Sequence, residues 1–169
     1  MIRGHRNLPL LLLQAREAAM AHFRPILKQF GLTDQQWRIA RVLGESRDGL
    51  EPGQIADVCK ILKPSLTGIL ARMAHMDLIE RHRSKVDQRR QRVSLTAKGR
   101  ALVDRALPLI ERQYLLIEAH AGAGVLETAY RTVDELMQML ARPIPSALTE
   151  TKRRPADPAR PALRRTAVR

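Results

Sequence analysis

The sequence has few of the residues on which secreted and membrane proteins depend. Its 169 residues include a single cysteine, Cys59, which cannot form an internal disulfide, and aromatic residues make up 3% of the chain. The apolar run Leu10–Leu13 is too short for a signal sequence or a membrane span. We therefore expect a cytoplasmic protein with no membrane partner.

The sequence also lacks the patterns of common catalytic and metal sites. Its five histidines are scattered rather than clustered at metal-binding spacing. No phosphate-binding loop, nucleotide-binding glycine pattern or nucleophile elbow is present. We therefore expect no enzymatic activity, no metal and no cofactor.

Acidic residues are in deficit. The chain has 30 lysine and arginine residues against 17 aspartate and glutamate residues, a formal charge of +13. Residues 151–169 hold seven of the basic residues and one acidic residue, so the rest of the chain is basic in its own right. Such an excess favours a polyanionic partner such as nucleic acid and, more weakly, an anionic membrane surface. The alternative is that the charge only keeps the protein soluble.

Apolar residues near the start recur at helical spacing, which predicts a helix over residues 10–30. The stripe consists of Leu13, Met20, Phe23, Leu27 and Phe30. Arg16 occupies the missing position of this stripe, where it either pairs with an acid and reaches water or anchors a ligand. Gly31 ends the helix, and Thr33 to Gln36 form a capping box for a second helix that turns Trp37, Ala40 and Leu43 inward.

Two short helices separated by a tight turn follow, which is a helix-turn-helix layout. The first is expected at residues 54–58, and the second runs from Pro64 to Met76. The buried stripe of the second helix is Leu66, Ile69, Leu70 and Met73. Its other side carries the small or basic residues Ser65, Thr67, Gly68 and Arg72, which suit the floor of a DNA major groove. An ordinary solvated face would have the same periodicity.

A cationic hairpin is predicted next. Residues 78–84 and 90–95 are strand-like, with a turn at Lys85 to Arg89 between them. Residues 79–92 contain six basic residues and two acidic ones. A helix-turn-helix followed by a hairpin is a winged helix, and an arginine at the hairpin tip suits the narrow, negative minor groove. We expect Asp87 to orient Arg89 for this contact.

Two further helices are predicted over residues 97–120 and 125–140. Their apolar positions are Leu102, Ala106, Leu109, Ile110, Tyr114 and Ile117 in the first, and Leu126, Tyr130, Val133, Met137 and Leu140 in the second. These stripes and the first helix expose more apolar surface than one small winged helix covers, which predicts a second copy of the chain as the cover. Beyond Pro143 the composition predicts a disordered tail, which either adds non-specific DNA affinity or is passive.

The order of these blocks resembles the MarR family of bacterial transcription regulators. The resemblance lies in Gln54-Ile55-Ala56, Pro64–Met73, Leu78-Ile79, Asp87–Arg90 and Val93–Gly99. The segments Gln14–Met20, Phe23–Pro25 and Leu32–Ile39 look like the branch of homoprotocatechuate-degradation operon repressors. The chain departs from the family at Asp77, where many relatives have glycine. Aspartate adopts the left-handed backbone conformation less readily than glycine, so this departure affects the angle at which the wing begins.

The resemblance implies a mainly α-helical fold with a small β-hairpin wing, a winged helix-turn-helix within an intertwined homodimer. It divides the chain into an N-terminal dimerisation helix (1–33), a DNA-binding lobe (34–100), C-terminal dimerisation helices (101–142) and a basic tail (143–169). The DNA-binding residues expected from the patterns and the resemblance are Lys63, Pro64, Ser65, Thr67, Gly68, Arg72, Lys85, Asp87, Arg89 and Arg90.

The family's ligands imply an effector pocket between the dimer helices and the DNA-binding lobe. There Arg16 would hold a carboxylate, Trp37 would form an aromatic wall, and His5 and Arg6 would reach the pocket of a partner. For Trp37, plain core packing remains the alternative.

These inferences predict a homodimeric repressor that binds an inverted-repeat operator in double-stranded DNA. A small aromatic or heteroaromatic carboxylic acid would release it, and the controlled genes would serve aromatic-acid catabolism. Two alternatives stay open. One is an architectural DNA-binding protein without an inducer, and the other is a redox regulator that uses Cys59.

Overall fold

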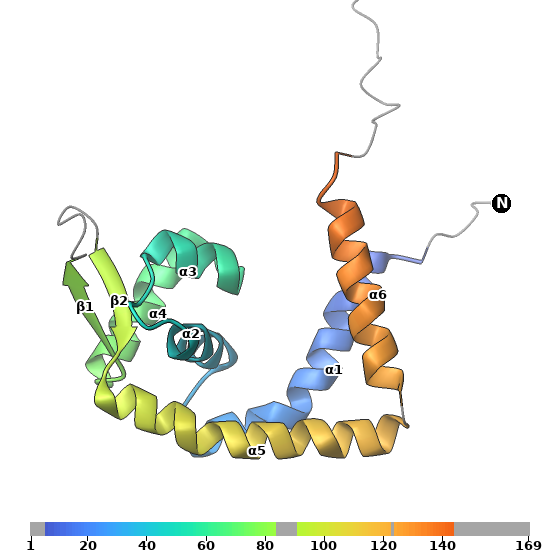
Figure 1. The fold of residues 1–169 in the computed structure, drawn as a ribbon, viewed down its shortest axis with the longest axis horizontal. Helices are drawn as coiled ribbons and strands as arrows, with labels where there is room; N and C mark the ends of the chain where they lie inside the picture. The colour runs from blue at the N-terminus through green and yellow to red at the C-terminus, as the bar shows by residue number, and fades with distance from the viewer. Residues whose placement is uncertain (1–5, 84–90, 123, 144–169) are drawn as a thin grey trace, which may run out of the picture. The chain divides into compact units, whose positions relative to one another are not determined.

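A computed structural model describes residues 6–83, 91–122 and 124–143, and the chain separates into two units, residues 1–124 and residues 125–169. The first unit contains α1 (Leu8–Gln29), α2 (Asp34–Glu45), α3 (Pro52–Cys59), α4 (Lys63–His75), β1 (Ile79–Arg83), β2 (Gln91–Leu95) and α5 (Ala97–Ala121) (Figure 1). The second unit contains α6 (Val125–Leu140). The predicted fold class, mainly helical with a small hairpin, is confirmed.

The joint between α1 and α2 forms as its sequence predicts. Gly31 takes a positive φ of 68° just beyond the end of α1. The Thr33 hydroxyl accepts a hydrogen bond from the Gln36 N–H at 3.3 Å, and the Gln36 side chain accepts one from the Thr33 N–H at 2.9 Å. This reciprocal capping box satisfies two N–H groups that a helix start otherwise leaves unpaired.

The helix-turn-helix consists of α3 and α4. The first of these helices ends where Lys60 adopts a left-handed conformation with φ of 50°. Three residues later α4 begins, and it buries the predicted stripe of Leu66, Ile69, Leu70 and Met73. The stripe packs into the core of the first unit, so the opposite face of α4 is left free for other contacts.

The hairpin pairs β1 with β2 in antiparallel register, with Ile79 opposite Leu95 and Arg81 opposite Val93. Val93 and Leu95 are both buried, as the alternation of the sequence predicts. Leu50 extends the sheet through two hydrogen bonds with Val93, of 2.9 and 2.8 Å. The wing is therefore attached to the loop between α2 and α3 as well as to α4.

A fixed joint connects the end of α4 to the start of α5. Asp77 adopts the left-handed conformation with φ of 58°, so it takes the conformation that glycine would provide. The Thr96 hydroxyl donates to the Asp77 carbonyl at 2.7 Å, and Lys98 Nζ donates to the Met76 carbonyl at 2.9 Å. These two donors hold carbonyl groups at the end of α4, which helps to fix the direction in which the wing begins.

Two apolar residues of the predicted stripes are exposed to solvent in the single chain. Leu109 is 38% exposed because α5 buries Val103, Ala106 and Ile110 instead. Leu13 is 54% exposed because the part of α1 that packs against the core begins at Met20.

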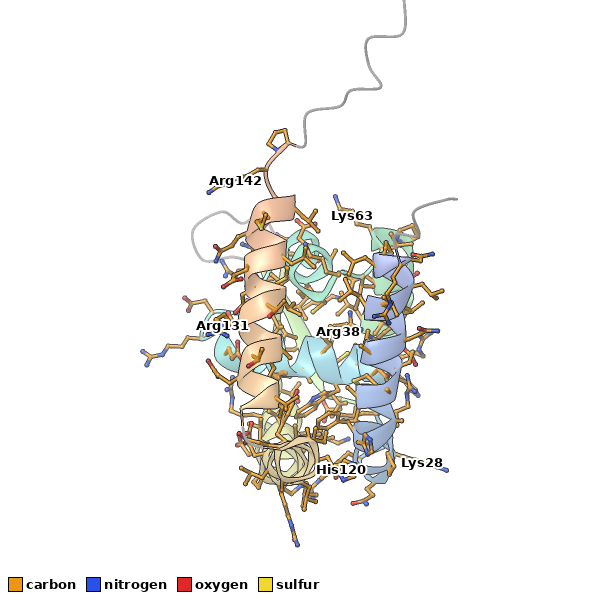
Figure 2. All side chains as sticks on the ribbon, turned by 90° about the vertical axis from the view of Figure 1, so that its right-hand side faces the viewer. Lys28, Arg38, Lys63, His120, Arg131 and Arg142 are labelled. Carbon is orange, nitrogen blue, oxygen red and sulfur yellow. The ribbon has the colours of Figure 1, made fainter. Side chains whose placement is uncertain are left out.

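The second unit carries α6 over the predicted range, and this helix has no buried residue within the described part of the unit. Its exposed apolar residues are Val125, Tyr130, Val133, Met137, Met139 and Leu140. Charged side chains such as Arg131 extend from other positions of the helix (Figure 2). None of the described helices is both long and apolar enough to cross a membrane.

Candidate functional site

The free face of α4 is exposed at every predicted position. Lys63, Pro64, Ser65, Thr67, Gly68 and Arg72 are all exposed. Lys63 extends from the first turn of the helix (Figure 2). A Cβ atom built on Gly68 would lie 3.6 Å from Arg72 Nη1, so the guanidinium lies over the glycine. Because the residue at position 68 has no side chain, the base edges of a DNA major groove could come close to the backbone of α4 at this point.

A groove beside α4 adds a cation that the predicted DNA-binding residues did not include. This groove, of about 310 Å³, lies between the first turn of α3, the start of α4 and strand β1. Lys63 and Thr67 line it together with Arg81 of the wing. The excess of cations in residues 79–92 pointed to the wing in general, but the packing of β1 against α4 is what brings Arg81 to the groove that Lys63 lines.

The tip of the wing lies outside the described residues. Lys85, Asp87, Arg89 and Arg90 therefore stay predictions, as does the orientation of Arg89 by Asp87. Arg92 belongs to the described part of the wing, and its guanidinium donates to the Gly49 carbonyl. This arginine therefore holds the loop before α3 against β2.

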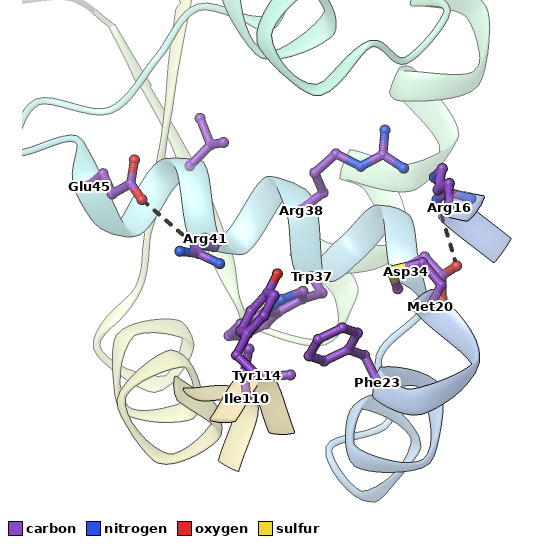
Figure 3. Close-up of a pocket in the computed structure, with 11 residues that line it drawn as sticks. Arg16, Met20, Phe23, Asp34, Trp37, Arg38, Arg41, Glu45, Ile110 and Tyr114 are labelled. Carbon is purple, nitrogen blue, oxygen red and sulfur yellow. Dashed lines mark ion pairs between the residues drawn. The ribbon is translucent and has the colours of Figure 1, made fainter. Parts of the chain in front are cut away.

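A second cavity, a pocket of about 260 Å³, lies between α1, α2 and α5 (Figure 3). The predicted residues Arg16 and Trp37 both line it. Sequence reasoning missed the remaining lining residues, which are Met20, Phe23, Asp34, Arg38, Arg41, Val42, Glu45, Ile110 and Tyr114. The helical spacing of Asp34, Arg38, Arg41 and Glu45 around Trp37 was the signal that could have found the wall from α2.

Aromatic and apolar side chains form one wall of this pocket. The rings of Phe23 and Tyr114 lie with centroids 4.7 Å apart and tilted by 49°, and Figure 3 shows them beside Trp37. Trp37 is 8% exposed and belongs to the core cluster as well. Both interpretations of Trp37, pocket wall and core residue, thus describe the same side chain.

Charged side chains line another part of the pocket. Arg16 forms an ion pair with its neighbour Glu17 and lies 3.8 Å from Asp34 through its Nη2 atom. Arg24 contacts the same two carboxylates, and its Nη2 atom lies 3.0 Å from Asp34 Oδ2. The hydrogen bond from Arg24 lowers the pKa of Glu17, so this carboxylate stays ionised at lower pH. The pocket therefore combines an aromatic wall with the ion-paired arginines Arg16 and Arg41, which suits a flat organic anion.

The other predicted ligand residues are not in this pocket. Arg6 is exposed and does not line it within its own chain, and His5 lies outside the described residues. Their proposed reach into a partner's pocket stays a prediction. In the ranges 6–83, 91–122 and 124–143, no three histidine, cysteine, aspartate or glutamate side chains are grouped as a metal site would need.

Cys59 is 1% exposed. Burial raises the pKa of its thiol, which keeps the sulfur protonated and unreactive near neutral pH. This environment disfavours the redox-regulator alternative.

Known proteins share both the winged helix and the flanking helices of this chain. A model described as "MarR family" matches residues 30–90. The homoprotocatechuate degradative operon repressor of Escherichia coli is 44% identical over 135 residues, which cover 80% of this chain and 90% of the repressor. The crystal structure of transcriptional regulator PA4135 has a TM-score of 0.75 at 40% identity, covering 82% of this chain and all of that one. NadR in complex with 4-hydroxyphenylacetate has a TM-score of 0.69 at 38% identity, covering 84% of this chain and 97% of NadR.

Proposed function

The chain belongs to the MarR family of transcriptional regulators, and from this we propose that it is a homodimeric repressor whose operator affinity is lowered by a small aromatic carboxylic acid. The genes it controls would serve the breakdown of such acids. The main support for the proposal is the pocket between α1, α2 and α5. Helix α2 separates this pocket from the helix-turn-helix, and the pocket lining suits an aromatic anion.

The DNA-binding part of the proposal rests on the free face of α4 and on the wing. The exposed residues Ser65, Thr67 and Gly68 would face base edges, while Lys63 and Arg72 would reach phosphates or a guanine. Arg89, oriented by Asp87 at the tip of the wing, would enter the minor groove. Lys85 and Arg90 would add contacts to the backbone of the DNA.

The homodimer accounts for apolar side chains that the described chain leaves in solvent. Each unit carries such residues: Leu8, Leu10, Leu12 and Leu13 at the start of α1, Leu115 and Leu116 on α5, and the exposed stripe of α6. Soluble monomers rarely expose apolar surface on this scale. A second copy would cover these segments and present two recognition helices about 34 Å apart, which matches an inverted repeat. We therefore propose dimerisation roles for residues 1–33 and 101–142 and DNA binding for residues 34–100.

The effector class follows from the chemistry of the pocket lining. The guanidinium of Arg16 suits a carboxylate, and the rings of Phe23, Trp37 and Tyr114 suit an aromatic ring. The 4-hydroxyphenylacetate bound to NadR has both a carboxylate and an aromatic ring, so it is the probe to test first.

The test uses the purified full chain and duplexes that it selects from a random library. Light scattering should show a dimer, and fluorescence anisotropy should show a specific duplex bound ~10³-fold or more tightly than a scrambled one. Adding 4-hydroxyphenylacetate or a related aromatic acid should weaken specific binding. A ratio near one between the two duplexes would favour the architectural alternative. A specific complex that no aromatic acid weakens would contradict the proposed effector class.

A further inference from the structure

Arg38 belongs to the effector pocket and to the helix-turn-helix at the same time. It is half-buried on α2 and lines the pocket together with Arg16 and Trp37. Its Nη1 atom donates a hydrogen bond to the backbone carbonyl of Cys59, the last residue of α3. Figure 3 shows the side chain extending from α2 on the side away from Trp37 and Tyr114. The Arg38 side chain thus connects the lining of the pocket to the end of the first helix of the helix-turn-helix.

The carbonyl that Arg38 holds is one that the helix cannot satisfy by itself. The last carbonyls of an α-helix have no partner within the helix and carry partial negative charge. At the end of α3 the N–H groups of Lys60 and Ile61 both donate to the Ala56 carbonyl, and the chain then turns through the left-handed Lys60. Arg38 supplies a positively charged donor for the Cys59 carbonyl at this turn. Because α4 begins three residues after Lys60, this contact helps to fix the start of the recognition helix.

We propose, on the basis of the effector function above, that Arg38 is the positioning residue through which the pocket controls the recognition helix. A carboxylate and the Cys59 carbonyl compete for its guanidinium. The carboxylate has the advantage because an arginine–carboxylate pair forms two parallel, charge-assisted hydrogen bonds. An aromatic acid in the pocket therefore draws Arg38 away from Cys59. The turn between α3 and α4 then loses a fixed contact, and the recognition helix no longer holds the orientation that the operator requires.

The experiment measures coupling between ligand and operator rather than operator affinity alone. Arg38→Met removes both the carboxylate contact and the carbonyl contact while it keeps much of the side-chain length. Arg38→Lys keeps the charge but not the paired donors of the guanidinium. Arg112→Met, which changes an exposed arginine of α5 that lines none of the pockets described above, controls for the loss of one positive charge, provided that light scattering shows the variant to be a dimer. For each protein, anisotropy gives the ratio of operator dissociation constants with and without saturating 4-hydroxyphenylacetate, and calorimetry gives the ligand affinity.

The expected ratio is ~10 or more for the wild-type protein and for Arg112→Met, which lies in the usual range of coupling between two sites. For Arg38→Met the ratio should fall to within about twofold of one even though the variant still binds the ligand. Arg38→Lys should recover part of the coupling. A residue with a merely structural role would change the affinity for the operator but would leave this ratio at the wild-type value.

Amide hydrogen exchange supplies a second measurement at the turn itself. Ligand added to the wild-type protein should speed exchange of the Lys60 and Ile61 amides, and ligand-free Arg38→Met should show the same fast exchange. An Arg38→Met variant with wild-type coupling would overturn the inference and leave the proposed function standing. A wild-type protein whose operator binding no aromatic acid weakens would overturn the proposed function and, with it, the coupling role of Arg38.

Discussion

Asp34 lies between two arginines of α1: its Oδ2 atom is 3.8 Å from Arg16 Nη2 and 3.0 Å from Arg24 Nη2. Arg24 is the closer partner, and its Nε atom also donates a hydrogen bond to Asp34 Oδ2 at 3.2 Å. Arg16 can therefore turn toward a ligand anion without leaving the Asp34 carboxylate unpaired. The observed ion pairs of Arg16 are therefore compatible with the proposed role of this residue as a ligand anchor.

Replacing Arg16 should separate effector binding from DNA binding. In Arg16→Ala the pocket loses a charge-assisted contact to the carboxylate, so we expect the affinity for 4-hydroxyphenylacetate to fall ~10-fold or more. Operator affinity without ligand should stay within about threefold of wild type, because Arg16 lies outside the helix-turn-helix and the wing. Calorimetry and anisotropy measure the two quantities. Lys28→Ala is the matched control, since it removes an exposed cation of the same helix that does not line the aromatic pocket. If the same ligand concentration releases both Arg16→Ala and the wild-type protein from the operator, Arg16 is a structural residue and does not anchor the ligand.

Arg81 should contribute affinity that does not depend on sequence. It lines the groove beside Lys63, where it can reach a phosphate. Arg81→Ala should weaken binding to specific and scrambled duplexes by similar factors, and the slope of log affinity against log salt should fall in magnitude by about two for the dimer, one for each protomer. A titration of both duplexes at several salt concentrations measures this. If only the specific duplex loses affinity, Arg81 reads a base edge or positions a residue that does.

Arg89 should behave differently from Arg81 because it is predicted to enter the minor groove at one place in the site. We expect Arg89→Ala to weaken operator binding by ~10-fold or more while the dimer stays intact. Asp87→Ala should produce part of the same loss, since the arginine would remain without its orienting carboxylate. Gel shift and light scattering measure affinity and assembly separately. Wild-type operator affinity in Arg89→Ala would reject the assignment of the wing tip to DNA.

The sequence predicted the local elements because each has its own short-range signal. The capping box at Thr33 and the stripe from Leu66 to Met73 needed no knowledge of the rest of the chain. The inward face of α5 was harder, because Leu102, Val103, Ala106, Leu109 and Ile110 offer more than one apolar stripe. Only packing against the other helices selected Val103 over Leu109.

The pocket could not be assembled from sequence for a related reason. Its aromatic wall brings Phe23 of α1 against Tyr114 of α5, far apart along the chain. The link from Arg38 to the Cys59 carbonyl has no residue pattern at all, because its acceptor is a backbone atom. Such contacts depend on how the helices pack, which periodicity does not specify.

Gly99 should be required for stability. A Cβ atom at this position would lie 2.0 Å from the Leu78 carbonyl oxygen and 2.9 Å from its carbon, and both belong to the backbone of the joint between α4 and the wing. We expect Gly99→Ala to lower the free energy of unfolding by roughly 1–3 kcal/mol, and the midpoint of thermal unfolding by about 2–4 °C for each kcal/mol. Gly53→Ala is the control, because nothing lies within 4 Å of its added Cβ. Equal midpoints for the two variants would show that the joint can relax.

Cys59 should be inert in the folded protein. It is 1% exposed, and burial raises the pKa of its thiol. A raised pKa in the folded state means that the thiol favours folding at pH values below its unfolded pKa, and that this contribution is lost as the pH rises through the alkaline range. We expect an aromatic disulfide reagent to modify Cys59 at least ~100-fold more slowly in buffer than in denaturant, because reaction requires a thiolate that solvent can reach. Hydrogen peroxide should leave operator binding unchanged in the wild-type protein, with Cys59→Ala as the control for oxidation of methionine. Rapid modification of the native thiol, together with an oxidant response that Cys59→Ala lacks, would restore the redox regulator as the better account of this protein.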